Sequence, residues 1–591
     1  MKNKRKHKIK AIIDLSILLS VVVVINLLST GYYKKFDLTK EKRYTLSETS
    51  VKLAESVDDY IYFKVYLHGD LSSKFKLLKN AVSDVLTEFR ELSGKNIEIE
   101  FVDPFEGKDN KEKNDLLQAF EQKGLRPYDD VDDASIESQT RNLIVPGAEV
   151  FYGSGKSFVL YFLKTELGMA NEENINQSIE NLEYEIAHAI RKCKADQNKK
   201  IGILTGHGEL DPLEMYDLTK ELSTFYRVDE LNIDLRNEEN IKIYESKLQD
   251  NEEDAKIILA GLQNRINQYD AVVIAKPTID LSKEEAFLID QYILKGGKTI
   301  WMLDALNAEM DSMRTGRMIC TDYPLENIRE LLFHYGVRIN LDLLQDFRCN
   351  DIKLRDPYSA NAFRNFPWVY FPVFTSDSKL KKHPISRNME GVWGRFCGTM
   401  TLLKKDNITA TPLLVSSDKT KVSNSPALVE FSIIDKLRKQ DPAFFASYNG
   451  GHQVVAALIE GNFNSSFSRR NVRSEIPFID KGKSSMIVIS DGDMARNHVS
   501  SDGGYLELGK DHITGRYFAN KKFLLNSFDF MLDDLGLIEI RSKEIILRLL
   551  DKDKIKEELG FWQLVNVGMP IFILLLFASV NTFIRKRKYA K

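Results

Sequence analysis

The hydrophobic pattern places one long apolar stretch near each end of the chain. Residues 11–30 form the first stretch and residues 561–584 the second. A helix rises 1.5 Å per residue, so about 20 apolar residues cross a hydrocarbon core of roughly 30 Å. The pattern therefore predicts two transmembrane helices. A cleaved signal peptide is the alternative for the first segment, because small residues stand at Ser29 and Gly31.

Basic tails lie outside both apolar stretches, at residues 1–10 and 585–591. Positive residues that flank membrane helices tend to remain cytoplasmic. Both termini are therefore expected inside the cell, and the chain from about Tyr32 to Leu559 is expected on the other side of the membrane.

Within a first domain expected over residues 45–165, the segment from Tyr60 to Pro104 shows a strand, helix, strand pattern. Apolar residues alternate with polar ones around residues 61–67 and 97–101, and they recur at three- and four-residue steps over residues 75–92. This order favours a right-handed βαβ unit and a thioredoxin-like α/β domain, although the segment LHGDLSS stands where a redox CxxC would be expected. Residues 166–198 are predicted to form a connecting helix.

The segment AEVFYGSGKSFVLYF contains a GSGKS that resembles part of a phosphate-binding loop. A Walker A loop needs a further Gly at the position that Val150 occupies. Because the flanking residues alternate and favour β structure, we predict a hairpin with its tip at Gly153 to Lys156 and no ATPase activity.

Residues 199–535 contain the unbroken apolar runs IGIL, AVVIA, TIWML and SMIVIS, which alternate with amphipathic helices. Such runs are typical of strands buried on both faces of a parallel sheet. We predict Asp211 as one helix N-cap, and a capping box formed by Ser282 and Glu285 on another helix. The segment from about 305 to 483 is predicted to be a partly β insertion of undetermined topology. The fold class is therefore α/β.

Polar residues follow several of these strands, at the sheet edge where ligands bind in open α/β sheets. They are His207, Glu209, Asp304, Asp491 and Asp493. A histidine with several carboxylates can bind a divalent metal or act in acid/base catalysis. The interpretation we favour is structural, with a glycine turn around His207 and aspartates that cap the following elements. These five residues are thus candidate ligand-binding residues, and we predict no catalytic residue, no resident metal and no cofactor.

Charge and cysteine content narrow the class of protein further. The formal net charge is -3, so nucleic acid is not an expected partner. Four scattered cysteines form no metal motif, and an exported domain leaves open a disulfide between two of Cys320, Cys349 and Cys397. An aromatic and basic cluster at Arg387, Trp393, Arg395 and Phe396 suits either a binding surface or the edge of a core.

Several long segments together resemble the GldG family, gliding-associated auxiliary components of ABC transporters in the Bacteroidetes. The segments are FDLTKEKRYTLSETSVKL, INQSIENLEYEIAHAIRK, IGILTGHGE and DAVVIAKPTIDLSKEEAFLIDQYILKGGKTIWMLDA. The resemblance implies an inner-membrane protein with a large periplasmic region that works with an ABC ATPase and a multispanning permease. It also implies a non-enzymatic, substrate-binding-type role, and an amidotransferase-like fold for residues 199–535 without the nucleophilic Cys.

Two other classes of function are compatible with the same sequence. A periplasmic metal-dependent hydrolase or degenerate amidotransferase would use His207, Asp304 and Asp491. A structural scaffold that couples a transporter to surface machinery would need no ligand pocket.

Overall fold

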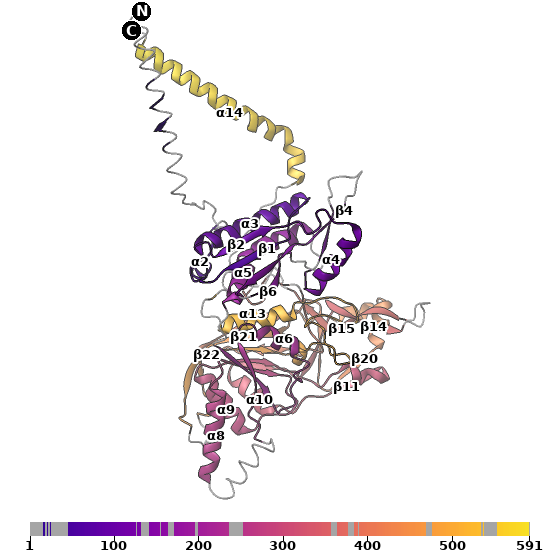
Figure 1. The fold of residues 1–591 in the computed structure, drawn as a ribbon. Coiled ribbons are helices and arrows are strands. Elements are labelled where there is room, and N and C mark those ends of the chain that lie inside the picture. Colours follow the sequence, from indigo (N-terminus) through magenta and orange to yellow (C-terminus); the bar gives the residue numbers. More distant parts are fainter. Residues whose placement is uncertain are drawn as a thin grey trace, which may run out of the picture. The chain divides into compact units, whose positions relative to one another are not determined.

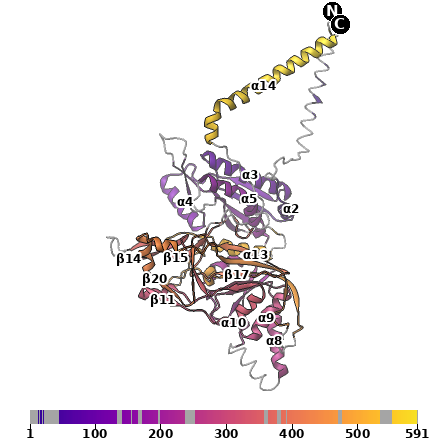
Figure 2. The ribbon, with the colours of Figure 1, turned by 180° about the vertical axis from the view of Figure 1, so that it is seen from behind.

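The computed structural model describes most of the chain between residues 45 and 589 (Figures 1 and 2). The described ranges are 45–125, 127–131, 141–153, 155–163, 171–194, 199–235, 252–355, 363–375, 383–387, 389, 391–468, 476–532, 536 and 552–589, with positions 13, 16, 17, 20, 21 and 24. The chain divides into two compact units, Met1–Lys543 and Glu544–Lys591. Most of the first predicted membrane helix, the basic tail before it and the end of the chain after residue 589 lie outside the described residues.

The first part of the larger unit is a four-stranded sheet of order β2-β1-β5-β6. Strands β1 and β2 are parallel and joined by helix α3, so the predicted βαβ unit is confirmed, and β5 runs antiparallel to β1. Leu78, Val82 and Leu86 on α3 are fully buried, because its apolar stripe recurs once per turn. The elements are α2 (Glu48–Glu55), β1 (Ile61–Val65), α3 (Ser73–Leu92), β2 (Ile97–Phe101), α4 (Asn110–Gln122), β3 (Tyr128–Val131), β4 (Arg141–Ile144), β5 (Gly147–Tyr152), β6 (Lys156–Tyr161) and α5 (Asn171–Cys193).

A nine-stranded sheet forms the second part, in the order β12-β17-β21-β22-β10-β9-β7-β8, with β18 also paired to β21. The four apolar runs become β7, β9, β10 and β22, which are mutually parallel as predicted. On β9, Val273 faces one core while Val272 and Ile274 face another, so the strand is buried on both sides. Helices α6 and α13 cover one face, and α8, α9 and α10 cover the other (Figure 1). The elements are β7 (Lys200–Thr205), α6 (Tyr216–Leu222), β8 (Arg227–Asn232), α8 (Glu252–Ile266), β9 (Ala271–Ala275), α9 (Lys283–Leu294), β10 (Lys298–Met302), β22 (Lys481–Ile489), η2 (Gly492–Ala495) and α13 (Asn520–Leu532).

The segment predicted as an insertion extends the same sheet. Strand β21 pairs antiparallel with β22, and β17 and β18 pair with β21. Shorter strands form small separate sheets, β11 with β20, β13 with β19, and β14 with β15 and β16. The elements are η1 (Met310–Thr315), β11 (Arg317–Cys320), α10 (Glu326–His334), β12 (Val337–Ile339), β13 (Asp342–Asp346), β14 (Cys349–Arg355), β15 (Phe363–Phe374), β16 (Val392–Trp393), β17 (Met400–Leu402), β18 (Ile408–Val415), β19 (Thr420–Asn424), β20 (Ala427–Glu430), α11 (Ser432–Arg438), α12 (Pro442–Ala446) and β21 (Val454–Asn464).

The prediction of a helix capped by Asp211 is wrong, because α6 begins only at Tyr216. Asn497 accounts for the delay. Its backbone N–H donates to the carbonyl of Glu214 at 2.7 Å, and its side-chain amide donates to the carbonyl of Leu213 at 3.0 Å. The N–H of Asp217, which a helix starting at Asp211 would pair with the carbonyl of Leu213, donates instead to Oδ1 of Asn497 at 3.2 Å. Residues 212–215 form a turn instead.

Two local predictions about helix ends and disulfides have clear outcomes. Ser282 and Glu285 form the predicted capping box at the start of α9. All four cysteines are free, so the disulfide that the sequence left open is absent.

The residues that the structure describes in the smaller unit, 552–589, form one long helix, α14 (Lys552–Tyr589). Its segment Gly560–Arg587 contains an 18-residue window with a mean hydropathy of 2.1 and is long and apolar enough to cross a membrane. Apolar side chains such as Leu564 and Phe577 are exposed along it, as expected for a helix surrounded by lipid. Among the described residues this is the one helix with these properties.

Candidate functional site

The five predicted site residues divide between two buried clusters. Asp304 and Asp493 both contact Lys276, which the sequence pattern does not single out. Asp491 lies next to them and accepts the backbone N–H of Asp493. His207 and Glu209 instead meet Glu285, with Asp234 close by. We refer to these groups as the Lys276 cluster and the His207 cluster.

The Lys276 cluster lies at the carboxyl ends of β9, β10 and β22. Lys276 directly follows β9 and has a left-handed φ of 56°, with its N–H donating to the carbonyl of Met302 at 2.8 Å. Its Nζ lies 3.2 Å from Oδ2 of Asp304 and 2.8 Å from Oδ1 of Asp493. Glu309 also contacts Nζ. Because Lys276 is only 5% exposed, these carboxylates rather than water stabilise its charge.

Burial gives the three aspartates different protonation behaviour. It raises the pKa of Asp491 to about 8, helped by the charges of Asp304 and Asp493. It also raises the pKa of Asp304 to about 6, although Lys276 opposes this. For Asp493 burial acts in the same direction, but Lys276, Arg395 and Arg496 outweigh it and lower the pKa. At neutral pH, Asp493 and Asp304 are therefore both ionised partners of Lys276, whereas Asp491 is mostly protonated.

Backbone hydrogen bonds give the same aspartates a capping role. Asp491 Oδ1 accepts the N–H of Asp493 at 2.9 Å at the start of η2, and Asp304 Oδ1 accepts the N–H of Gly492 at 2.6 Å. Asp491 Oδ2 also accepts the N–H of Arg395 at 3.0 Å. These contacts stabilise the local backbone and the buried cation, and Oδ2 of Asp491 also accepts the thiol of Cys397, with Sγ at 3.3 Å. The arrangement suits a rigid sheet edge.

The aromatic and basic cluster lies beside this edge. Trp393 and Phe396 are buried, and the guanidinium of Arg395 lies 4.2 Å from the centre of the Trp393 ring. This arrangement favours the core-edge interpretation for these three residues.

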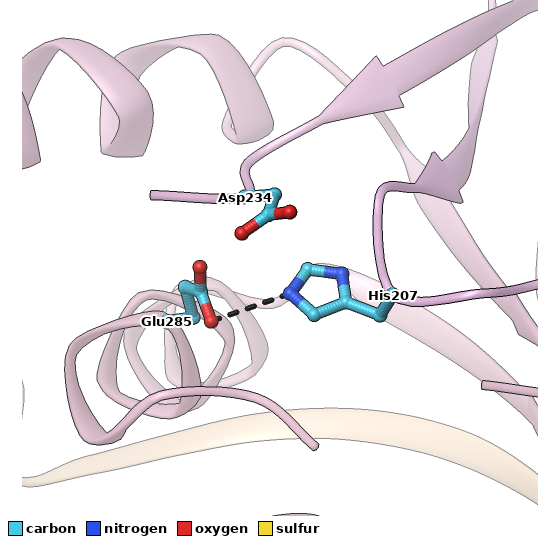
Figure 3. A group of neighbouring side chains, drawn as sticks. All are labelled: His207, Asp234 and Glu285. Atoms are coloured by element: carbon cyan, nitrogen blue, oxygen red, sulfur yellow. Dashed lines mark hydrogen bonds and ion pairs between the residues drawn. The ribbon is translucent and has the colours of Figure 1, made fainter. Parts of the chain in front are cut away.

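The His207 cluster draws its side chains from three elements (Figure 3). His207 lies on the turn after β7, Asp234 follows β8, and Glu285 lies in the first turn of α9. Nε2 of His207 is 3.3 Å from Oε2 of Glu285. Nδ1 of His207 is 3.4 Å from Oε1 of Glu209, but the two atoms lack hydrogen-bond geometry.

Glycines on both sides of His207 let the turn insert its side chain into the protein. Gly206 has a φ of 113°, and a Cβ there would lie 2.8 Å from Cβ of Asp234. Gly208 has a φ of 73°, and a Cβ would lie 2.1 Å from Oγ1 of Thr278. These positions require glycine, so TGHGE builds the site as well as turning the chain.

Electrostatics couples His207 to its carboxylates. Burial alone would lower the pKa of His207, but the adjacent carboxylates of Glu209 and Glu285 raise it to about 9. Burial alone would likewise raise the pKa of Glu285, but His207 and the backbone N–H groups of Leu235 and Ser282 lower it to about 2. Without another cation, the imidazole is thus an imidazolium between two carboxylates.

The sequence analysis missed three residues of these clusters. Lys276 follows AVVIA directly, and a cation after a doubly buried strand is a usable signal. Glu285 was assigned only to its capping box. Asp234 follows β8, whose mixed pattern RVDELN gave no strong strand prediction.

The GSGKS segment joins β5 to β6 in the predicted hairpin. The two strands pair antiparallel, with Gly147 opposite Tyr161 at one end and Tyr152 opposite Lys156 at the other. Lys156 thus opens an exposed strand and does not begin a helix, as a phosphate-binding loop requires. Lys156→Ala is expected to leave the stability of the protein unchanged. Neither the parent protein nor this variant should bind a nucleotide with micromolar affinity. Equilibrium binding of a fluorescent ATP analogue measures this, and binding abolished by the substitution would contradict it.

The described part of the chain thus combines a mixed α/β unit with a separate helix able to cross a membrane. The profile of a family described as an ABC-type uncharacterized transport system, an auxiliary family, matches residues 198–527. This is more than half of the chain, and the chain belongs to that family. A second profile, described as a domain of unknown function, matches residues 40–151.

Two further similarities cover large parts of the chain. An uncharacterized protein of Borreliella burgdorferi is 22% identical over 603 residues, covering 100% of both chains. The solved mmIFT52 N-terminal domain is 12% identical with a TM-score of 0.30, covering 57% of this chain and 98% of that one.

Proposed function

We propose that this protein is a non-enzymatic, substrate-binding-type auxiliary subunit of an inner-membrane ABC transporter complex. The family match over residues 198–527 is the observation that carries the proposal. ATP hydrolysis would come from an ABC ATPase subunit and passage across the membrane from a multispanning permease. The resemblance to GldG extends this to an association with gliding motility.

The proposed layout has a helix at each end in the lipid bilayer and the bulk of the chain in the periplasm. The exposed apolar helix Gly560–Arg587 and its basic end support the C-terminal anchor. The order β2-β1-β5-β6, with a βαβ unit followed by an antiparallel hairpin, supports a thioredoxin-like first domain. The parallel core of the larger sheet supports an amidotransferase-like second domain.

Affinity purification of the tagged protein from native membranes in mild detergent tests the partners. We expect an ATPase with a Walker A loop and a polytopic permease to co-purify in constant ratio. A tagged version of an unrelated single-helix membrane protein controls for adventitious capture. Recovery of neither subunit, even after chemical crosslinking in intact cells, would contradict the proposal.

Reporter fusions test the topology. Alkaline phosphatase is active only outside the cytoplasm, so a fusion after Lys543 should be active and a fusion after Lys591 inactive. In the sequence, Lys543 precedes helix α14 and Lys591 follows it. An active fusion at Lys591 would show that the C-terminus is not cytoplasmic.

A further inference from the structure

We propose that His207, Asp234 and Glu285 bind one divalent transition metal ion of the zinc class, and that Glu209 orients the histidine. Neither the family nor its relatives assign a metal to this position. The site would be structural, and it is independent of the partners proposed above.

The donor atoms have the spacing and chemistry of a metal site. One ligand atom from each of the three residues lies within 4.8 Å of the others. Nε2 of His207 and Oε2 of Glu285 are 3.3 Å apart. Two ligands at 2.0–2.2 Å from tetrahedral zinc are about 3.4 Å apart, so this pair needs little rearrangement. An imidazole with two carboxylates favours zinc and its first-row neighbours over magnesium or calcium, which prefer oxygen alone.

Two unsatisfied atoms in the cluster define the role proposed for Glu209. Nδ1 of His207 and Oε1 of Glu209 are buried without a hydrogen-bond partner, although they are 3.4 Å apart. Such buried orphan atoms are rare in folded proteins. A metal on Nε2 fixes the proton on Nδ1, and donation from Nδ1 to Glu209 then makes the carboxylate–histidine–metal arrangement of many metal sites. The N–H of His207 already holds Oε2 of Glu209 at 2.6 Å, ready for that role.

Glu285 is oriented as a metal ligand would need to be. Its Oε1 accepts the N–H of Leu235 at 2.7 Å, and its Oε2 accepts the N–H of Ser282 at 2.6 Å. A carboxylate has about four lone-pair positions, so each oxygen keeps one for an ion. These two hydrogen bonds fix the plane of the carboxylate before the ion arrives.

Burial decides the role of the proposed ion. The side chains of His207 and Glu285 are both 0% exposed. A hydrolytic metal keeps a coordination position open to substrate, whereas a structural metal has four ligands and is closed off from solvent. The three side chains leave one position, which a second carboxylate oxygen or an enclosed water would complete here. The ion would therefore hold the loops after β7 and β8 against the start of α9.

The competing occupant of the site is a proton. An imidazolium between Glu209 and Glu285 would explain the same contacts without any metal. The two cases differ in measurable ways, because only the metal site gains stability with added zinc and requires Asp234 as a ligand.

The experiment uses the full-length protein in detergent, purified with a tag that contains no histidine. The protein is stripped with a chelator, and zinc is then titrated against a competing chelator dye. We expect one zinc per chain by elemental analysis and a higher melting temperature on zinc addition. His207→Gln and Asp234→Asn should each weaken zinc binding at least 100-fold, and Glu209→Gln should weaken it 10–100-fold.

The control for loss of a histidine is His452→Gln, because His452 is also hydrogen-bonded through its ring, with Nδ1 3.0 Å from the carbonyl oxygen of Ser416, but is exposed and lies outside the His207 cluster. This variant should bind zinc like the parent protein. Asp234→Asn preserves side-chain shape, so the test remains decisive if His207→Gln fails to fold. A parent protein that binds less than one fifth of an equivalent of zinc, or equal zinc binding by Asp234→Asn, would overturn the proposal in favour of the imidazolium bridge.

Discussion

Lys276→Met is expected to destabilise the larger unit by about 3–5 kcal/mol, because removal of one partner leaves buried carboxylates without their cation. Lys276 is 5% exposed, and its Nζ contacts Asp304, Glu309 and Asp493. Methionine has a similar volume, so the loss reports charge more than packing. Denaturant unfolding of the detergent-solubilised protein, followed by tryptophan fluorescence, measures the effect.

The penalty of Lys276→Met should depend on pH in a defined direction. In the variant, Asp304 and Asp493 lose the cation that lowers their pKa. The folded variant then retains protons that the unfolded chain, with aspartate pKa near 3.9, releases. The variant therefore loses stability as pH rises from about 4 upward. The difference in unfolding free energy between parent and variant should be larger at pH 8 than at pH 5.

A control and a rescue sharpen this result. Lys283→Met replaces an exposed lysine of α9 and should change stability by no more than about 0.5 kcal/mol. Adding Asp493→Asn to Lys276→Met should recover part of the loss, since one stranded carboxylate is removed. A pH-independent loss below about 1 kcal/mol would show that Lys276 is not held by these charges.

Asp529→Asn is expected to cost about 3 kcal/mol by breaking the contact between α5 and α13. Oδ1 of Asp529 accepts Nη1 of Arg191 at 2.8 Å and the hydroxyl of Tyr226 at 3.2 Å, while Nε2 of His188 lies 3.4 Å from Oδ2. The cost falls at the lower end for a buried pair, because Arg191 is 14% exposed and keeps its bond to Tyr226. Denaturant unfolding at pH 7 measures it, with the exposed Asp435→Asn as the matched control.

The advantage of Asp529 over asparagine should disappear in acid. Burial alone would raise the pKa of Asp529, but His188 and Arg191 lower it to about 2. The stabilisation is therefore complete above the unfolded pKa near 3.9 and is lost as pH falls toward 2. Equal stability of the two proteins at pH 7 would contradict the assigned role of this contact.

Periodicity and local capping were sufficient for the elements that depend on neighbours in the chain. The runs AVVIA and TIWML became doubly buried parallel strands, the GSGKS segment became a hairpin tip, and Ser282 with Glu285 formed a capping box. Each of these features is decided by residues within a few positions of one another, so the sequence carries the signal directly.

Only the tertiary structure decided which polar residues meet. Asn497 delays a helix some 280 positions earlier, and Lys276 joins Asp304 to Asp493 across three strands. The capping box accounts for Glu285 from the local sequence alone. In the folded protein, Glu285 also contacts His207, which lies on the turn after β7. Each element contributes a single residue to a buried cluster. The contacts between these distant residues therefore leave no periodic pattern in the sequence. The sequence by itself thus determined the buried parallel strands, the capping box of α9 and the apolar C-terminal helix, while long-range pairing alone decided the composition of both buried clusters.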